Sequence, residues 1–140
     1  MTTLKFSVNI NATKEKVWET LWNDATYRQW TAAFCEGSYA KGDWEEGSKI
    51  LFLIPNGDGM FSTVEKKIPN EQMVFRHLGV VKNGIEEPKD WENATESYYL
   101  AENNGITKLD VALGAAPGFE EYLNDTFPKA LEILKQVAEQ

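Results

Sequence analysis

Cysteine and histidine are almost absent from this sequence, which contains one of each, Cys35 and His77. A single cysteine cannot form a disulfide within the chain, and one cysteine with one histidine cannot make a zinc site of the Cys/His type. We therefore expect no metal and no cofactor. Cys35 is also a poor catalytic nucleophile, because its neighbour Glu36 does not favour a thiolate.

Basic residues and long apolar runs are also scarce. The chain has 14 Lys and Arg against 22 Asp and Glu, a formal net charge of −8. This charge repels phosphate backbones, and with no Lys/Arg cluster to offset it we expect no nucleic-acid partner. No apolar stretch approaches the roughly 18 residues of a membrane helix, and the first residues lack the apolar segment of a signal peptide. We expect a cytoplasmic protein with no membrane insertion.

Aromatic residues, by contrast, are abundant. The 140 residues include 5 Trp, 5 Tyr and 7 Phe, and 42% of the chain is hydrophobic. This composition is typical of a folded protein, and the length suits one domain of about 100–150 residues. No repeat, low-complexity tract or linker divides the chain. We interpret residues 1–140 as a single domain.

The first thirty residues contain one strand pattern and two helix patterns. Residues 4–10 alternate apolar and polar side chains, which predicts a half-buried strand. Thr13 is suited to cap a helix, and the apolar residues that follow lie on one helical face: Val17, Trp18, Leu21 and Trp22. Asp24 is suited to cap a second short helix that ends near Trp30.

From residue 38 to residue 115 the pattern indicates strands joined by turns. Predicted strands cover residues 39–44, 50–54, 60–68, 73–81, 97–100 and 107–113. Asn104-Gly105 is typical of a two-residue hairpin, since both positions need a positive φ. A longer connection over residues 82–92 is predicted as a loop. Short strands with no helix between them predict an antiparallel meander.

The last segment, residues 118–140, carries one apolar stripe that predicts a long amphipathic helix. The residues of this stripe are Phe119, Leu123, Phe127, Ala130, Leu131, Leu134 and Val137. A curved antiparallel sheet has a face to cover, and this helix supplies the cover while the two short helices close one end. Because such a sheet cannot touch the helix everywhere, we expect a cavity between them.

Several of these segments resemble the START-like (SRPBCC) superfamily. The resemblance lies in the segment from Thr13 to Trp18, in Trp30, in the segment from Trp44 to Lys49, in the strand from Gly59 to Glu65 and in the hairpin from Gly105 to Leu109. It covers essentially the whole chain, mostly at packing positions. The branch that the chain resembles most comprises homologues of the activator of the heat-shock-protein ATPase.

The resemblance implies an α+β helix-grip fold. Such a fold has a curved antiparallel sheet of about seven strands around a long C-terminal helix, two short helices after the first strand, and a pocket between sheet and long helix. Members of the superfamily bind lipids, hormones or polyketides, and some are cyclases. The co-chaperones of this branch carry an additional N-terminal domain that these 140 residues do not include, which argues against a chaperone role.

A pocket for an apolar ligand needs large, rigid walls and a few polar groups. Strand parity and helix face select the following ligand-binding candidates: Trp30, Phe34, Phe52, Phe75, His77, Trp91, Tyr98, Phe119, Tyr122 and Phe127. The competing interpretation is that most of these side chains simply fill the core. Tyr98 and Tyr99 point to opposite faces of one strand, so only one of them can reach a pocket.

His77 shares a strand face with Met73 and Phe75. In a pocket it would be the only group that titrates near neutral pH, and it could then act as an acid or base. We favour a hydrogen-bonded structural histidine. No standard catalytic motif occurs, so no catalytic residue is assigned.

Trp91 lies near the end of the predicted loop over residues 82–92. Its neighbours are polar, and a tryptophan is costly to leave in water. One hypothesis makes the loop a lid in which Trp91 closes the mouth of a pocket. The equal alternative is a tryptophan that anchors the loop on the edge of the sheet.

Three functions remain open from the sequence. The leading one is binding of an apolar or amphipathic small molecule under the C-terminal helix. The alternatives are a cyclase-like or hydrolase-like enzyme that uses His77, and a protein-interaction module of the co-chaperone kind. A homodimer through the outer sheet face is also open, if Leu51, Leu53 and Phe61 point outward.

Overall fold

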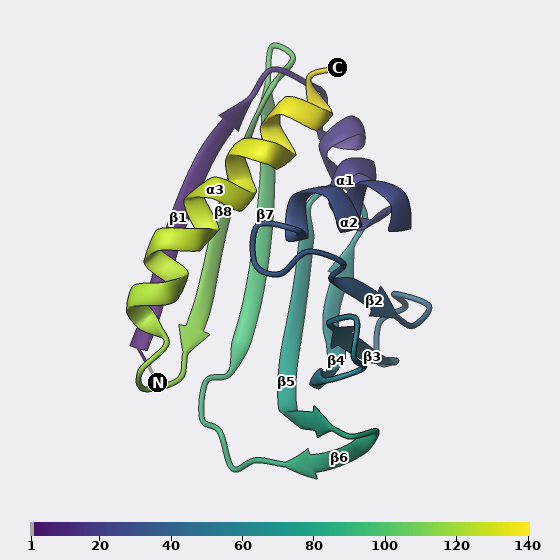
Figure 1. Cartoon of the computed structure of the whole chain (residues 1–140). Helices are drawn as coiled ribbons and strands as arrows, with labels where there is room; N and C mark the ends of the chain where they lie inside the picture. Colours follow the sequence, from purple (N-terminus) through teal and green to yellow (C-terminus); the bar gives the residue numbers. More distant parts are fainter. Residues whose placement is uncertain (1) are drawn as a thin grey trace.

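One antiparallel sheet dominates the structure, a computed structural model that describes residues 2–140. Its strands run in the order β1-β8-β7-β5-β4-β3-β2, and β6 pairs with β5 outside this path (Figure 1). The strands are β1 (Thr2–Ile10), β2 (Tyr39–Lys41), β3 (Lys49–Leu53), β4 (Gly59–Ile68), β5 (Gln72–Lys82), β6 (Ile85–Pro88), β7 (Thr95–Asn103) and β8 (Ile106–Ala115). With three helices, they form the predicted α+β helix-grip arrangement.

The two short helices follow β1, as the sequence predicts. Helix α1 (Lys14–Trp22) begins after Thr13, whose side chain accepts a hydrogen bond from the backbone N–H of Lys16 at 3.2 Å. Thr13 is therefore the N-cap, and it satisfies one of the free N–H groups of the first turn.

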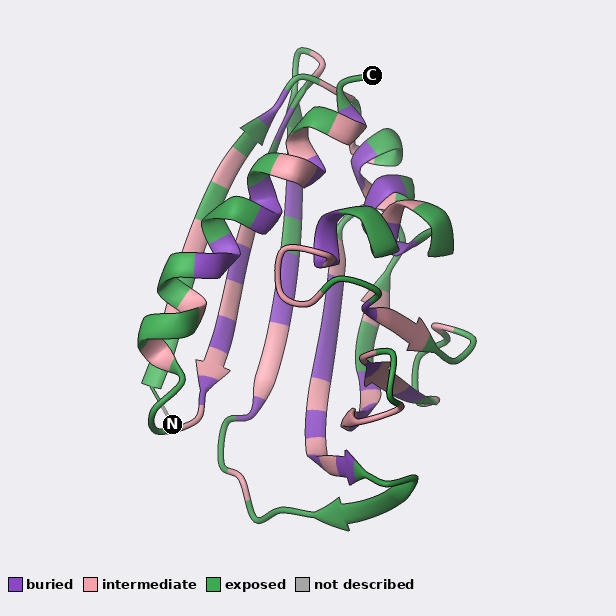
Figure 2. Ribbon diagram, in the orientation of Figure 1, coloured by how far each residue is buried: buried purple, intermediate pink, exposed green. Residues whose placement is uncertain are grey.

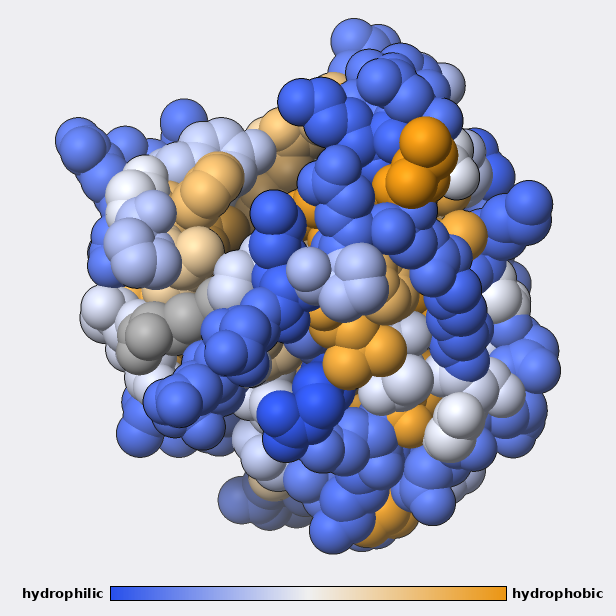
Figure 3. Space-filling model, turned by 90° about the horizontal axis from the view of Figure 1, so that it is seen from below, coloured by the Kyte–Doolittle hydropathy of each residue, from blue (hydrophilic) through white to orange (hydrophobic). Residues whose placement is uncertain are grey.

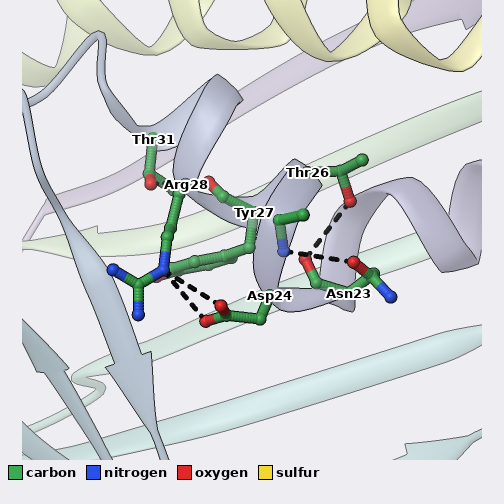
Figure 4. Close-up of polar contacts among 7 residues, drawn as sticks. Asn23, Asp24, Thr26, Tyr27, Arg28 and Thr31 are labelled. Carbon is green, nitrogen blue, oxygen red and sulfur yellow. Dashed lines mark hydrogen bonds and ion pairs between the residues drawn. The ribbon is translucent and has the colours of Figure 1, made fainter.

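Helix α2 (Asp24–Thr31) is capped by Asn23 rather than by Asp24, which corrects the expectation from the sequence. Asn23 has extended backbone angles, and its Oδ1 accepts from the N–H of Ala25 at 3.1 Å (Figure 4). Asp24 is already helical, and both of its carboxylate oxygens lie 3.1 Å from Nε of Arg28. A helical residue cannot cap its own helix, so the asparagine one position earlier does so.

The predicted strands are all present, and the structure adds one more. The Asn104-Gly105 hairpin has φ angles of 53° and 79°, as a type I′ turn requires. Asn83-Gly84 has nearly the same angles, 53° and 76°, and turns β5 into β6. Residues 82–92 are therefore a loop only in part. This second Asn-Gly turn adds β6, so the sheet has eight strands where the sequence predicts about seven.

Helix α3 (Glu120–Ala138) lies across the β1, β8 and β7 side of the sheet, and α1 and α2 cover the neighbouring region (Figure 1). Its buried positions include Phe127, Ala130, Leu131 and Leu134. The rings of Phe127 and Phe6 stack with their centroids 5.0 Å apart. Figure 2 shows these buried turns facing the sheet, while β6 is exposed.

A second, smaller apolar cluster is separate from the core under the helices. Its buried members are Leu53, Phe61 and Val81, each only 7% exposed, and Leu51 packs against them. Leu53 and Phe61 therefore already bury most of their surface within the chain. A homodimer would gain little from these two residues.

Candidate functional site

A cavity of about 460 Å³ lies between the sheet, α2 and the first half of α3. This volume is within the range of about 300–1,000 Å³ found for small-molecule sites. Phe119 and Tyr122 line the cavity and are also 56% and 45% exposed, so this end is its mouth. Figure 3, which views the molecule from below, shows hydrophobic atoms around a hollow on this face, within a largely hydrophilic rim.

Almost all of the predicted candidates line this cavity. Those that do so are Trp30, Phe34, Phe52, His77, Trp91, Tyr98, Phe119, Tyr122 and Phe127. They come from α2 and the segment after it, from strands β3, β5 and β7, from the connection between β6 and β7, and from α3 and the residue before it. Segments far apart in the sequence thus supply one common wall.

Phe75 does not line the cavity, although its strand parity suggested it. Its side chain is fully buried, with ring centroids 5.0 Å from Phe52, 5.4 Å from Trp22 and 5.9 Å from Trp44. These rings pack against Phe75, which is absent from the cavity wall. Parity gives the face of the sheet but not the depth at which a side chain lies beneath others.

Helix α2 brings Tyr27 and Trp30 to the cavity. The indole Nε1 of Trp30 donates to the carbonyl oxygen of Leu21 at 3.2 Å, which ties the Trp30 ring to α1. The Tyr122 hydroxyl of α3 donates to the carbonyl oxygen of Phe34 at 2.8 Å. This bond joins the two sides of the mouth.

A polar network that sequence reasoning did not find lies on the sheet side of the cavity. Ser62 Oγ is 2.7 Å from Nδ1 of His77, and Nε2 of His77 is 3.2 Å from Oε1 of Glu96. The second oxygen of Glu96 accepts a short hydrogen bond from the hydroxyl of Tyr98. His77, Glu96 and Tyr98 line the cavity, whereas Ser62 is fully buried behind them.

Glu96 could have been found from the sequence. It lies two positions before Tyr98 on β7, so both side chains share a sheet face. Because acidic residues usually lie at the surface, composition alone does not suggest a Glu in a cavity wall.

The network fixes how His77 bonds in its neutral form. A carboxylate can only accept, so the Nε2 atom that faces Glu96 must carry hydrogen and donate. Nδ1 is then the acceptor for the hydroxyl of Ser62. Both ring nitrogens are therefore occupied by the protein, which matches the favoured interpretation of a hydrogen-bonded structural histidine.

Tyr98 in this network and Tyr27 near it both have raised pKa values. Burial raises the pKa of Tyr98 well above its usual value, and the nearby charge of Glu96 raises it further. The pKa of Tyr27 is raised for the same reasons, again mainly by burial. Both hydroxyls therefore stay protonated in the folded protein and can donate hydrogen bonds.

Trp91 is half-buried and lines the cavity from the connection between β6 and β7. This connection runs very close to β8: a Cβ at Gly114 would lie only 2.1 Å from the carbonyl oxygen of Asn93. Glycine at position 114 is thus required for the close approach. The missing Cβ leaves room for the segment that carries Trp91 to lie against β8.

The described residues contain no helix that is both long and apolar enough to cross a membrane. Nor do residues 2–140 bring three or more His, Cys, Asp or Glu side chains together as potential metal ligands.

Solved structures with the same architecture are numerous. The Aha1 dimer from Colwellia psychrerythraea superposes with a TM-score of 0.75 at 23% identity, and the match covers 99% of this chain and 97% of that one. Protein CV1439 from Chromobacterium violaceum gives a TM-score of 0.74 at 17% identity, over 100% and 99% of the two chains.

The chain has the helix-grip fold of these structures. DynU16, from the dynemicin biosynthetic locus, shares this fold with a TM-score of 0.72 at 17% identity; the match covers 99% of this chain and 47% of DynU16. All of these identities are below 25%, so the likeness concerns the helix-grip fold and not the ligand. A scan against protein-family models and a search of curated proteins find no match.

Proposed function

We propose that this helix-grip protein binds an apolar or amphipathic small molecule in the cavity under α3. The observation that carries the proposal is a cavity of about 460 Å³ with aromatic walls and an open mouth. Burial of ligand surface provides about 25 cal/mol per Å² before the costs of association, so such walls favour an apolar body.

The geometry supports binding better than catalysis by His77. A catalytic base needs a nitrogen within reach of a substrate, and both nitrogens of His77 already bond to Ser62 and Glu96. Ser62 is fully buried and does not line the cavity, so it is not placed to act as a nucleophile. We therefore assign no catalytic residue.

Two experiments test the proposal. Native mass spectrometry of freshly purified protein would show a retained small molecule as added mass.

The second experiment fills part of the cavity. Leu123→Trp replaces a half-buried aliphatic side chain of the cavity wall with a bulky ring and is expected to weaken binding of a hydrophobic fluorescent probe at least about tenfold. Ile106→Trp, at a 48% exposed hairpin position outside the cavity, is the control. Equal probe binding by both variants would contradict a ligand in this cavity.

A homodimer is a separate proposal, supported by the dimer formed by the similar Colwellia protein. Sedimentation velocity over a range of concentrations tests it. A single monomer species at all concentrations would contradict it.

A further inference from the structure

The cavity wall has an unbalanced polar composition. Glu96 is the only acidic residue in the wall formed by the described residues, and that wall contains no Lys or Arg. The side chain of Glu96 is 23% exposed, and among the described residues the one basic side chain that pairs with it is His77, which is charged only if protonated. A carboxylate at an apolar cavity without a strong cationic partner is costly unless more donors reach it.

Most hydrogen-bond donors in the wall are already used by the protein. The side chains of Trp30, Thr31, Ser38 and Tyr122 donate to backbone carbonyls. Tyr98 donates to Glu96 itself. The remaining side-chain donors, the hydroxyls of Tyr27 and Tyr39 and the indole N–H of Trp91, are neutral. No cation in the wall that residues 2–140 form balances the carboxylate of Glu96, so a positively charged donor on a ligand matches this wall better than an anion does.

Glu96 retains the capacity to accept more. Its two oxygens together have about four acceptor positions, and His77 and Tyr98 each occupy one. These two bonds hold the carboxylate in one orientation. An additional charge-assisted hydrogen bond from a ligand needs no rearrangement of Glu96.

Aromatic rings adjoin this carboxylate. The Tyr98 ring lies 6.4 Å from the Trp30 ring, which in turn lies 5.4 Å from the ring of Tyr27, and all three residues line the cavity. Ring faces attract cations, and they do so most strongly where water is excluded. The free acceptor positions of Glu96, its negative charge and the neighbouring ring faces thus all favour a cationic group that donates hydrogen bonds.

We propose that Glu96 is the polar anchor of the cavity and that the ligand is an apolar molecule carrying a protonated amine. The proposal rests on the proposed binding function and specifies its ligand class. The amine donates to the free acceptor positions of Glu96, and the apolar body lies toward Phe119 and Tyr122 at the mouth. An anionic head group is rejected because it would face Glu96 without a cation to offset it.

Three probes with the same apolar body test this ligand class: decylamine, decanol and decanoic acid. Isothermal titration calorimetry of the wild-type protein is expected to rank them in that order, with the amine at least about tenfold tighter than the acid. Glu96→Gln removes the charge and is expected to abolish the preference for the amine. Glu19→Gln, at an exposed position of α1, makes the same change in net charge away from the cavity and is expected to keep the preference.

The possible results separate this inference from the proposed function. If none of the probes binds, both fail. If all bind with equal affinity, or the acid binds best, the cavity binds apolar molecules but Glu96 is not the anchor. The same conclusion follows if Glu96→Gln still prefers the amine. The wild-type ranking alone can overturn the inference, even if Glu96→Gln does not fold.

Discussion

Nε2 of His77 on β5 lies 3.2 Å from Oε1 of Glu96 on the neighbouring strand β7. The strand register places Glu96 opposite Phe75, so His77 and Glu96 are diagonal neighbours on one sheet face. At this distance the pair joins a fully buried serine to a carboxylate that lines the cavity. The network is therefore part of both the folded core and the proposed binding site, and the two roles can be measured separately.

Replacing Ser62 with alanine tests the structural role. The change leaves Nδ1 of His77 without its donor in a buried position, so we expect a loss of about 1–3 kcal/mol in the free energy of unfolding. Urea denaturation measures it. Ser7→Ala, on the exposed face of β1, is the control and should change stability by less than about 0.5 kcal/mol. Similar small losses for both variants would show that the Ser62 bond contributes little.

Adjacent tyrosines on β7 provide a matched pair. Tyr98→Phe removes the hydroxyl that donates to Glu96 in a fully buried position, and we expect a loss of about 1.5–3 kcal/mol. Tyr99→Phe removes the same atom from a side chain that is 43% exposed, and it should be nearly neutral. Thermal and urea unfolding of the two variants check the difference. If Tyr99→Phe were as destabilising as Tyr98→Phe, the assigned bond would be wrong.

Stability should fall in alkaline solution. Burial raises the pKa of Tyr27 and Tyr98 in the folded state above the value of about 10 in the unfolded chain. Below that value both states hold the protons, so the stabilisation is complete; above it, only the unfolded chain releases them. The free energy of unfolding then drops by about 1.4 kcal/mol per pH unit for each tyrosine.

Denaturation curves and the ultraviolet absorbance of tyrosinate, followed from about pH 9 to pH 11, check this expectation. Tyr98→Phe should show a smaller alkaline slope than the wild type. Were all 5 tyrosines to ionise together near their usual pKa while the chain remains folded, the buried positions of these two would be contradicted.

Trp91→Ala distinguishes the lid from the anchor. Trp91 is half-buried and lines the cavity. If Trp91 is a lid, its replacement by alanine should lower probe affinity about tenfold and leave the melting temperature within about 2 °C of the wild type. Ile85→Ala on the adjacent β6, at a side chain that is 65% exposed, should alter neither quantity. A large fall in melting temperature with unchanged affinity would identify Trp91 as an anchor.

Local patterns in the sequence determined the elements of this fold. Alternation, helical spacing, Thr13 and the Asn104-Gly105 turn are effects of near neighbours along the chain, and the structure confirms each of them. Strand parity likewise put His77 and Tyr98 on the inner face. The hairpin that makes β6 was also encoded locally, in Asn83-Gly84.

Only the tertiary structure decided how deep each side chain lies and which distant groups meet. Phe75 has the correct parity for the cavity, yet rings from α1, β3 and the segment before it cover the side chain. Glu96 gains its position at the cavity because β5 and β7 pair in one register, which brings His77 to it across 19 positions of sequence. Periodicity specifies a face, whereas depth and partners depend on packing between elements that are remote along the chain.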